Sequence, residues 1–311
     1  MSGDFDLVVA GSGIAGLTAA LTGARLGLRT LCLTGDVLGG QLLSINKIDG
    51  YPGFPDGAAG YDLCPIAQEQ AVAAGADVAA TTLDRLTPQD SRWRLVTGDG
   101  ELTARGIVLA TGAALKELGV PGEDRLKGKG VSHCASCDAP LLRGKPVVVV
   151  GGGDSACQEA LTLAEAASKV TILHRGTELS AQHAYRDAVM QQANVEIRFN
   201  HVAEEILGEN GVTAVRARDQ AGTAESEIEA AGVFVYIGLA PATRYLDGAI
   251  KLGADGRIPT DTNLRTALTG VAAAGAVRQG WAGRAAASAG DGAAAAIAIA
   301  DYLRHDRWRD G

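Results

Sequence analysis

Short apolar runs that end in glycine recur along the chain, and they predict buried strands followed by tight turns. Residues 6–10 (DLVVA) lead directly into the glycine-rich stretch 11–16 (GSGIAG), and apolar residues at helical spacing follow over 17–26. A second strand is predicted at 30–33. Strand, glycine turn, helix and strand in this order form the setting that a dinucleotide-binding fingerprint requires.

The three glycines of this turn have separate expected roles. Gly11 allows the tight turn, Gly13 lets the backbone approach a pyrophosphate, and Gly16 lets the helix pack close to the sheet. The helix that follows would direct its free N–H groups and the positive end of its dipole at the phosphates.

The same order of elements recurs in the middle of the chain. Four valines at 147–150 predict a buried strand, residues 151–156 (GGGDSA) predict the turn, and a helix at 157–167 and a strand at 169–173 follow. Two such units favour two nucleotides bound by one chain. One functional unit with a degenerate duplicate is the alternative.

Two later strand-like runs, 107–113 and 232–238, end in small residues and predict the last strand of each unit. The chain would then cross between domains near residues 114 and 245, and the tail 270–303 would return to the first domain. We therefore expect an α/β protein with two Rossmann-like dinucleotide-binding domains of the three-layer ββα type. The first domain is discontinuous (1–114 and 245–311), and the second spans 115–244.

Charge and hydropathy narrow the class of protein. The formal net charge is −8 and the pI about 5.2, with no basic patch, which argues against a nucleic-acid partner. The longest wholly apolar run, 293–300, is far shorter than the ~20 residues that cross a bilayer. The acidic residues 1–6 are not typical of a signal peptide. We expect a cytoplasmic protein without a membrane partner.

Cys134-Ala135-Ser136-Cys137-Asp138 holds the one closely spaced pair among the five cysteines. Such a pair can close a small, reducible disulfide ring, and its geometry lowers the pKa of one thiol. Asp138 could move the proton that leaves or returns, and His133 could stabilise a thiolate. A zinc site would need a second pair of ligands, so no metal is expected. The remaining cysteines are expected to be small buried side chains: Cys32, Cys64 and Cys157.

With these motifs the chain resembles the low-molecular-weight thioredoxin reductases, which are flavin-dependent pyridine nucleotide-disulfide oxidoreductases. The resemblance runs through the whole chain in matching order. It is carried by residues 11–16, 34–35, 39–42, 51–53, 110–113, 128–132, 134–137, 151–156, Gly238 with Pro241, 270–271, 274–275 and Arg284.

The resemblance implies FAD on the first glycine motif and NADPH or NADH on the second. A hydride would pass from the nicotinamide to FAD, and electrons from FAD to the Cys134–Cys137 disulfide. From there they would reach a thioredoxin-like protein or a small disulfide or dithiol substrate. The family's pattern makes Cys137 the cysteine that faces the flavin, Cys134 the one that attacks the external disulfide, and Asp138 the acid/base group. It also implies rotation of one domain on the other, and a homodimer.

The same resemblance implies the nucleotide contacts. Those to FAD would come from Gly11, Ser12, Gly13, Ile14, Ala15, Gly16, Thr34, Gly35, Gly40, Gln41, Leu42, Thr111, Gly112, Ala113, Gly275, Arg284, Ala285 and Ala286. Those to the nicotinamide nucleotide would come from Gly151, Gly153, Asp154, Ser155, Ala156, His174, Arg175 and Gly238.

The chain departs from the family's pattern at three places. The family grips the 2′-phosphate of NADPH with His-Arg-Arg and a further arginine, whereas residues 174–180 read HRGTELS, with one arginine and the acidic Glu178. Arg186 is a candidate replacement. The aspartate that binds the FAD ribityl chain is Ala276 here, and the family's Arg-Gln-Ala near the flavin ring is 284–286 (RAA). NADPH and FAD are both expected to bind more weakly.

These departures leave three further hypotheses open. A dithiol oxidase would pass electrons from a small thiol substrate through the disulfide and FAD to oxygen, without a nicotinamide nucleotide. A reductase could be fed by NADH or a ferredoxin instead of NADPH. A redox-sensing or FAD-binding scaffold with little turnover is the alternative that is not an enzyme.

Overall fold

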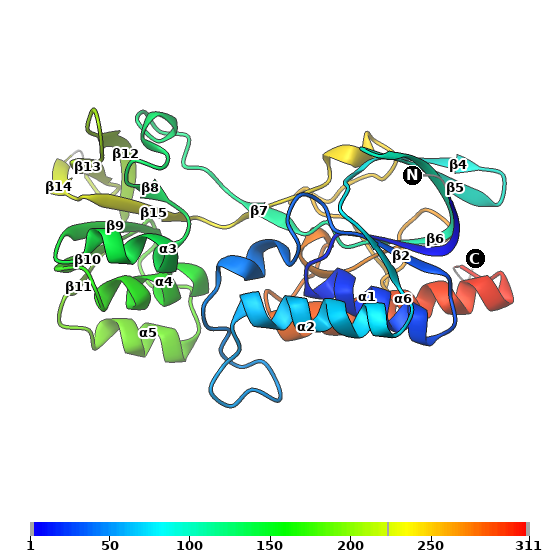
Figure 1. The fold of residues 1–311 in the computed structure, drawn as a ribbon. Coiled ribbons are helices and arrows are strands. Elements are labelled where there is room, and N and C mark those ends of the chain that lie inside the picture. The colour runs from blue at the N-terminus through cyan, green and yellow to red at the C-terminus, as the bar shows by residue number, and fades with distance from the viewer. Residues whose placement is uncertain (1–2, 223, 309–311) are drawn as a thin grey trace. The chain divides into compact units, whose positions relative to one another are not determined.

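The structure, a computed structural model, describes residues 3–222 and 224–308 of the chain (Figure 1). It divides into two compact units, one of residues 1–114 with 240–311 and one of residues 115–239. The second crossing therefore lies at residue 240 rather than near 245. Tyr245 and Leu246 belong to the first unit because both pack into its hydrophobic core.

The first unit is built on a sheet with the strand order β3-β2-β1-β6-β5-β4, and β17 also pairs with β6. Strands β1, β2, β3, β6 and β17 are parallel, and β4 and β5 are antiparallel neighbours. The strands span β1 Asp4–Ala10, β2 Thr30–Leu33, β3 Asp77–Ala79, β4 Leu83–Gln89, β5 Arg92–Thr97, β6 Gly100–Leu109 and β17 Val271–Ala273.

Alternation along β1 places two cores on the two faces of this sheet. Leu7 and Val9 pack in the cluster that contains the alanine-rich faces of the helices, and Val8 packs with Trp93 and Leu95 of the antiparallel strands. The helices are α1 Ile14–Arg25, α2 Gly60–Ala73 and α6 Ala285–His305, with the 3-10 turns η1 Gly40–Ser44, η4 Arg244–Leu246 and η5 Gly275–Val277. Figure 1 shows α1, α2 and α6 gathered on one side.

The second unit repeats the three layers. A fully parallel sheet, β11-β10-β9-β15-β8, has helices on one face and the antiparallel sheet β12-β13-β14 on the other. The strands are β8 Val131–Ser132, β9 Pro146–Gly151, β10 Lys169–His174, β11 Val195–Phe199, β12 His201–Leu207, β13 Ala214–Asp219, β14 Glu225–Glu229 and β15 Gly232–Tyr236. The helical segments are η2 Asp124–Leu126, α3 Ala135–Asp138, η3 Ala139–Leu142, α4 Asp154–Ala164 and α5 His183–Met190.

The two crossing segments, β7 (Ala113–Leu115) and β16 (Leu239–Pro241), pair with each other in a two-stranded sheet. The predicted α/β architecture with two Rossmann-like units is confirmed.

Both helices that follow the glycine turns begin three residues earlier than predicted. Helix α1 starts at Ile14 rather than 17, and α4 starts at Asp154 rather than 157. The reason is that the backbone is still extended at Gly13 and Gly153 (ψ 172° and −174°) and turns helical directly after them. The last residues of each motif are therefore the first turn of the helix.

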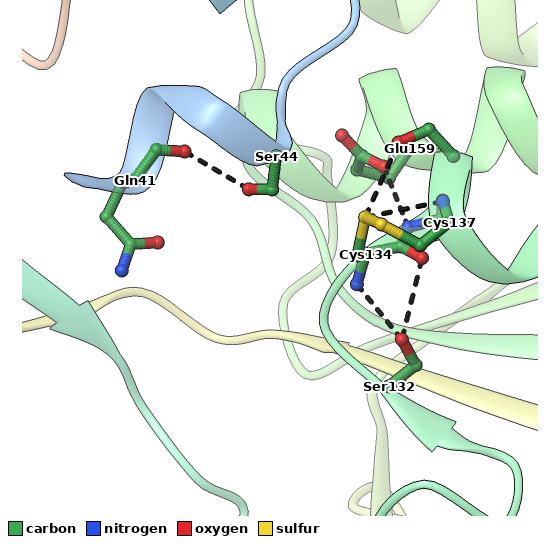
Figure 2. Close-up of a disulfide and its surroundings, with 8 residues drawn as sticks. Gln41, Ser44, Ser132, Cys134, Cys137 and Glu159 are labelled. Atoms are coloured by element: carbon green, nitrogen blue, oxygen red, sulfur yellow. Dashed lines mark hydrogen bonds between the residues drawn. A yellow bond between two sulfur atoms is a disulfide. The ribbon is translucent and has the colours of Figure 1, made fainter. Parts of the chain in front are cut away.

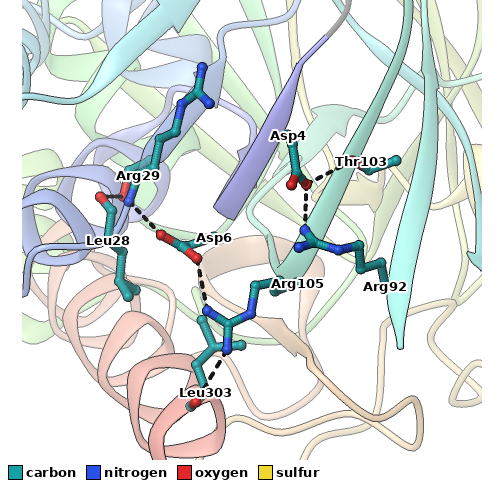
Figure 3. A network of polar contacts seen from close by, with 9 residues as sticks. Asp4, Asp6, Leu28, Arg29, Arg92, Thr103, Arg105 and Leu303 are labelled. Atoms are coloured by element: carbon teal, nitrogen blue, oxygen red, sulfur yellow. Dashed lines mark hydrogen bonds and ion pairs between the residues drawn. The ribbon is translucent and has the colours of Figure 1, made fainter. Parts of the chain in front are cut away.

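Polar contacts fix the first strand of the first unit (Figure 3). The Asp6 carboxylate accepts hydrogen bonds from the Arg29 amide (3.0 Å) and from Arg105 Nη1 (2.9 Å). Burial opposes ionisation of Asp6, but these two donors outweigh it and lower the pKa of the carboxyl. Asp4 pairs with Arg92 and accepts from Thr103 Oγ1 (2.8 Å).

Candidate functional site

The carboxyl ends of the parallel strands meet at one edge of the first unit. Ala10 of β1 is in register with Leu33 of β2 and Leu109 of β6, and Leu109 with Ala273 of β17. Ligands of parallel α/β sheets bind outside such an edge. The segments that leave these strands contain the residues expected to contact FAD: 11–16, 34–35, 111–113 and Gly275.

The first glycine turn has one closed side and one open side. A Cβ atom at Gly16 would overlap the Gly11 carbonyl oxygen, and one at Gly11 (φ 111°) would overlap the Ala110 carbonyl oxygen. A Cβ at Gly13 would meet no atom within 4 Å. Gly13 also precedes the first turn of α1, where unpaired N–H groups favour anions. The open space at this helix end fits a pyrophosphate.

Several of the expected FAD contacts have buried side chains. Ser12 is 1% exposed, and its Oγ donates to the Thr34 carbonyl oxygen (2.9 Å) and accepts from the Gly39 amide (3.3 Å). Ser12 thereby joins the first glycine turn to η1, which contains Gly40, Gln41 and Leu42. Ile14 and Ala15 are also buried in the core, so a nucleotide could reach only the backbone at these two positions.

The remaining expected contacts lie at other turns of the first unit. Thr111 follows β6, and its Oγ1 donates to the Ala242 carbonyl oxygen (2.8 Å). Gly112 accepts from the Ala242 amide (3.0 Å). Arg284 is the N-cap of α6, and Ala285 and Ala286 form its first turn.

A buried ion pair lies beside Gly275. The next residue, Ala276, is the position at which the family resemblance leads us to expect an aspartate. The Asp291 carboxylate accepts from the Gly275 amide (3.1 Å) and from Arg278 Nε (2.7 Å) and Nη2 (2.8 Å). The side chains of Arg278 and Asp291 are only 16% and 11% exposed. The sequence analysis missed this pair, because residues 13 positions apart meet only through the fold.

Asp291→Ala is expected to lower the free energy of unfolding by about 3–5 kcal/mol, because it leaves the Arg278 guanidinium buried and unpaired. Denaturant titration measures this loss. The double variant Asp291→Ala, Arg278→Ala should lose less than the single variant, since no charge remains buried. A loss below about 1 kcal/mol in Asp291→Ala would mean that the pair acts as a surface ion pair.

The second glycine turn has the same two sides. Gly151 ends β9 with φ 145°, and a Cβ there would overlap the Tyr236 carbonyl oxygen. Gly153 is open, because the nearest atom to a Cβ would be Ser180 Oγ at 3.8 Å. Gly238, after β15, has φ 106° and no atom within 4 Å of a Cβ position. This edge of the second unit therefore also leaves room for a nucleotide.

The loop 174–182 folds over the second glycine turn. Ser180 donates through its amide to the Gly152 carbonyl oxygen (2.8 Å), and Asp154 accepts from the Gln182 amide (2.7 Å). His174 Nε2 lies 2.9 Å from the Glu178 carbonyl oxygen. Ser155 is exposed and Ala156 is buried. Within 174–180, Arg175 is the one guanidinium, and it is exposed, as is Glu178.

Cys134 and Cys137 form a disulfide, with their Cα atoms 5.4 Å apart (Figure 2). Cys134 is the N-cap of the short helix α3, and its Sγ accepts from the Cys137 amide (3.3 Å). The Cys134 amide donates to Ser132 Oγ (3.0 Å). Cys137 is exposed and Cys134 half-buried. Asp138 ends α3 and donates its amide to the Cys134 carbonyl oxygen (3.3 Å).

His133 contacts the backbone in this structure. Its Nδ1 lies 2.9 Å from the Val235 carbonyl oxygen, so the ring is held against β15. The three other cysteines are free and buried, as predicted. Burial raises the pKa of Cys32 to about 12 and that of Cys64 and Cys157 to about 11, which makes them poor nucleophiles.

Glu159 is a buried acid that the sequence analysis did not single out. It is 9% exposed, and its Oε2 accepts from the Ala135 amide (3.2 Å). Burial raises its pKa to about 7, against the opposing effects of the Ala135 amide and the Tyr236 phenol. The burial of Glu159 could have been predicted from the helical pattern of the sequence. The buried side chains of α4 include Ala156, Ala160 and Leu163, and a residue three after Ala156 falls on the same face.

A cluster of metal ligands and a membrane-spanning helix are both absent from residues 3–222 and 224–308. No three His, Cys, Asp or Glu side chains gather there as ligands for a metal ion. Among the helices of that part of the chain, none has the length and apolarity needed to cross a membrane.

Residues 5–292 match the family model of the pyridine nucleotide-disulphide oxidoreductases. The chain is 38% identical to the thioredoxin reductase of Treponema pallidum over 303 residues, which cover 97% of this chain and 98% of the relative. Its fold is similar to that of thioredoxin reductase from Lactococcus lactis (TM-score 0.93, 33% identity, 96% of this chain and 99% of the other). The same holds for the enzyme from T. acidophilum (TM-score 0.92, 33% identity, 97% and 99%).

The cofactors of this family are FAD and a nicotinamide nucleotide, and the open spaces at Gly13 and Gly153 fit two such groups. A disulfide lies in the same unit as the second space. The chain belongs to the pyridine nucleotide-disulphide oxidoreductase family, as an FAD-dependent thiol–disulfide oxidoreductase of the thioredoxin reductase type.

Proposed function

We propose that this protein reduces the disulfide of a thioredoxin-like protein, and that small disulfides are simpler substrates of the same dithiol. The observation that carries the proposal is the Cys134–Cys137 disulfide at the start of α3. The curated relatives and solved structures named above are thioredoxin reductases. An assay with oxidised thioredoxin and a chromogenic small disulfide, each with NADPH or NADH, tests it. Turnover of neither disulfide would contradict it.

The cofactor-binding residues are proposed from the two glycine turns that leave space at Gly13 and Gly153. FAD would be held at the first, around Gly13, and the nicotinamide nucleotide at the second, around Gly153. The bound cofactors would supply the electron pair that reduces the disulfide. Asp138 would provide the proton needed at the dithiol, because it ends the helix that Cys134 begins.

The chain's own groups then carry out thiol–disulfide exchange. A Cys134 thiolate would accept the Cys137 amide hydrogen bond and lie at the N-terminal end of α3, and both features stabilise its charge. Cys134 attacks one sulfur of the external disulfide, which forms a mixed disulfide and releases one thiolate, and Asp138 protonates that thiolate. Cys137 then attacks Cys134, which releases the second thiol and restores the Cys134–Cys137 disulfide.

We further propose that NADPH and NADH support turnover to within about tenfold of each other, because Arg175 is the one guanidinium between residues 174 and 180. Arg175→Ala should lower kcat/KM for NADPH about tenfold, since one charged hydrogen bond is worth about 1.5 kcal/mol or more, and leave NADH unchanged. Steady-state kinetics with both donors measures this. Gly153→Ala serves as the control variant. It should lower kcat/KM for both NADPH and NADH, because its Cβ would enter the space that either nucleotide needs. An equal loss for both donors in Arg175→Ala would contradict a role at the 2′-phosphate.

A homodimer and a cytoplasmic location complete the proposal. Tyr61 and Val72 lie on one face of helix α2 and are about half exposed (51% and 50%), which supports an interface with a second copy of the chain at this face. Sedimentation of the FAD-loaded protein distinguishes one chain from two.

A further inference from the structure

Glu159 lies beside the first turn of α3, the short helix that Cys134 begins. It belongs to α4, and its carboxylate reaches the amide of Ala135, the first residue of α3 (Figure 2). Ala135 itself is fully buried, between Cys134 and the rest of that helix. Burying a carboxylate is costly, and the Ala135 amide and the Tyr236 phenol compensate only part of that cost. Thiol–disulfide exchange by Cys134, Cys137 and Asp138 does not itself require this acid.

A second buried polar group lies beside Glu159. Tyr236, the last residue of β15, is 7% exposed, and its phenol is close enough to Glu159 to favour the ionised form of that carboxyl. Burial raises the pKa of Tyr236, and the charges of Glu159 and Asp138 raise it further. The phenol is therefore in electrostatic reach of two acids, the buried Glu159 and Asp138 at the end of α3.

The first amides of α3 are divided between two acceptors. The Cys137 amide points to Cys134 Sγ, and the Ala135 amide points to Glu159 Oε2. A thiolate at Cys134 and a carboxylate at Glu159 would thus be two like charges at one helix end. Like charges at one helix end disfavour each other's ionised form. The charge on Glu159 must therefore affect how readily Cys134 ionises.

Several further titratable groups lie on the elements packed against α4. They are Cys134, Cys137 and Asp138 on α3, Tyr236 on β15, Lys169 and His174 on β10, and His183, Tyr185, Arg186 and Asp187 on α5. Strand β9 has none. Arg186 affects the thiol of Cys157, and within residues 3–222 and 224–308 Tyr236 is the one titratable side chain that shifts the pKa of Glu159.

We propose that Glu159 is a positioning residue for the dithiol, which holds the first amide of α3 and sets through its own charge the ease with which Cys134 becomes a thiolate. While the disulfide is closed, no thiolate competes with the carboxylate. Once the dithiol forms and Cys134 ionises, Glu159 takes up a proton, so the two groups share one negative charge. When the disulfide closes again, the carboxyl releases that proton. This inference rests on the proposed function only in requiring a dithiol that can be reduced.

Three variants separate charge from packing. Glu159→Gln keeps an oxygen acceptor for the Ala135 amide and removes the charge, so the thiolate pKa of Cys134 should fall by about one unit or more. Glu159→Asp keeps the charge, so the thiolate pKa of Cys134 should stay close to its value in the unmodified protein. Glu165→Gln removes an exposed carboxylate just after α4 and should leave the thiolate pKa of Cys134 unchanged. The FAD-loaded proteins are reduced with a chemical dithiol, which is then removed, and thiolate absorbance in the ultraviolet is followed against pH.

The outcomes do not depend on turnover of thioredoxin. An unchanged thiolate pKa in a folded Glu159→Gln protein would overturn the inference, as would equal shifts in Glu159→Gln and Glu159→Asp. A measurement on the unmodified protein covers the case in which a variant does not fold. Reduction near neutral pH should add a protonated carboxyl band to the infrared difference spectrum, and absence of that band would also overturn the inference.

Discussion

Replacing either Cys134 or Cys137 by serine is expected to lower kcat for thioredoxin reduction by about 1,000-fold or more. A serine hydroxyl is not ionised at neutral pH and cannot form a disulfide with its neighbour, so neither exchange step remains possible. The measurement is the rate of thioredoxin reduction with saturating nicotinamide nucleotide, at matched FAD content.

The buried free cysteines supply the matched controls. Cys64→Ala and Cys157→Ala remove thiols whose pKa is raised by burial, and both variants should keep most of the activity. Retention of half or more of the activity in the Cys134 and Cys137 variants would show that the dithiol does not carry the electrons.

The second large effect concerns the two kinds of glycine in the first turn. Gly13→Ala should fold normally and bind FAD about 10- to 100-fold more weakly, because its Cβ would enter open space that the cofactor needs. Gly16→Ala should lower the free energy of unfolding by about 3 kcal/mol or more, since its Cβ would overlap the Gly11 carbonyl oxygen. Flavin binding titrations and denaturant unfolding of both variants measure the two effects.

Each variant is the control for the other, because both replace glycine by alanine and the two positions are three residues apart. A Gly13→Ala protein that binds FAD as tightly as the unmodified chain would remove the cofactor from this turn. A Gly16→Ala protein of unchanged stability would contradict the close packing of α1 on the first turn.

Local patterns were enough to predict the framework of the fold. The valines at 147–150 form the fully parallel strand β9, and the predicted strands at 30–33 and 169–173 agree with β2 and β10 to within one residue. Glycine turns and strand alternation depend on neighbours in the sequence, so they can be read without the fold. The start of α1 was missed because the turn and the helix share residues 14–16.

Features that depend on distant partners could not be read in this way. The second crossing was misplaced because Leu246 packs with strand residues such as Val8 and Leu95, far away in the sequence. The pairing of Asp291 with Arg278 likewise needs the turn η5 and helix α6 in place. Glu159 lay on a predictable face of α4, but its partner Ala135 is 24 residues earlier. Its link to the dithiol therefore required the structure.

The most direct test of the central claim is the number of electron pairs that one chain takes up. The FAD-loaded protein is titrated anaerobically with NADPH and, in parallel, with NADH, and the visible flavin band is followed. The dithiol and the flavin each accept one pair. We therefore predict two equivalents of nucleotide per chain before bleaching is complete, and one equivalent for the double variant Cys134→Ser, Cys137→Ser. One equivalent for both proteins, or no bleaching by either nucleotide, would contradict the transfer of electrons from a nicotinamide nucleotide to the Cys134–Cys137 disulfide.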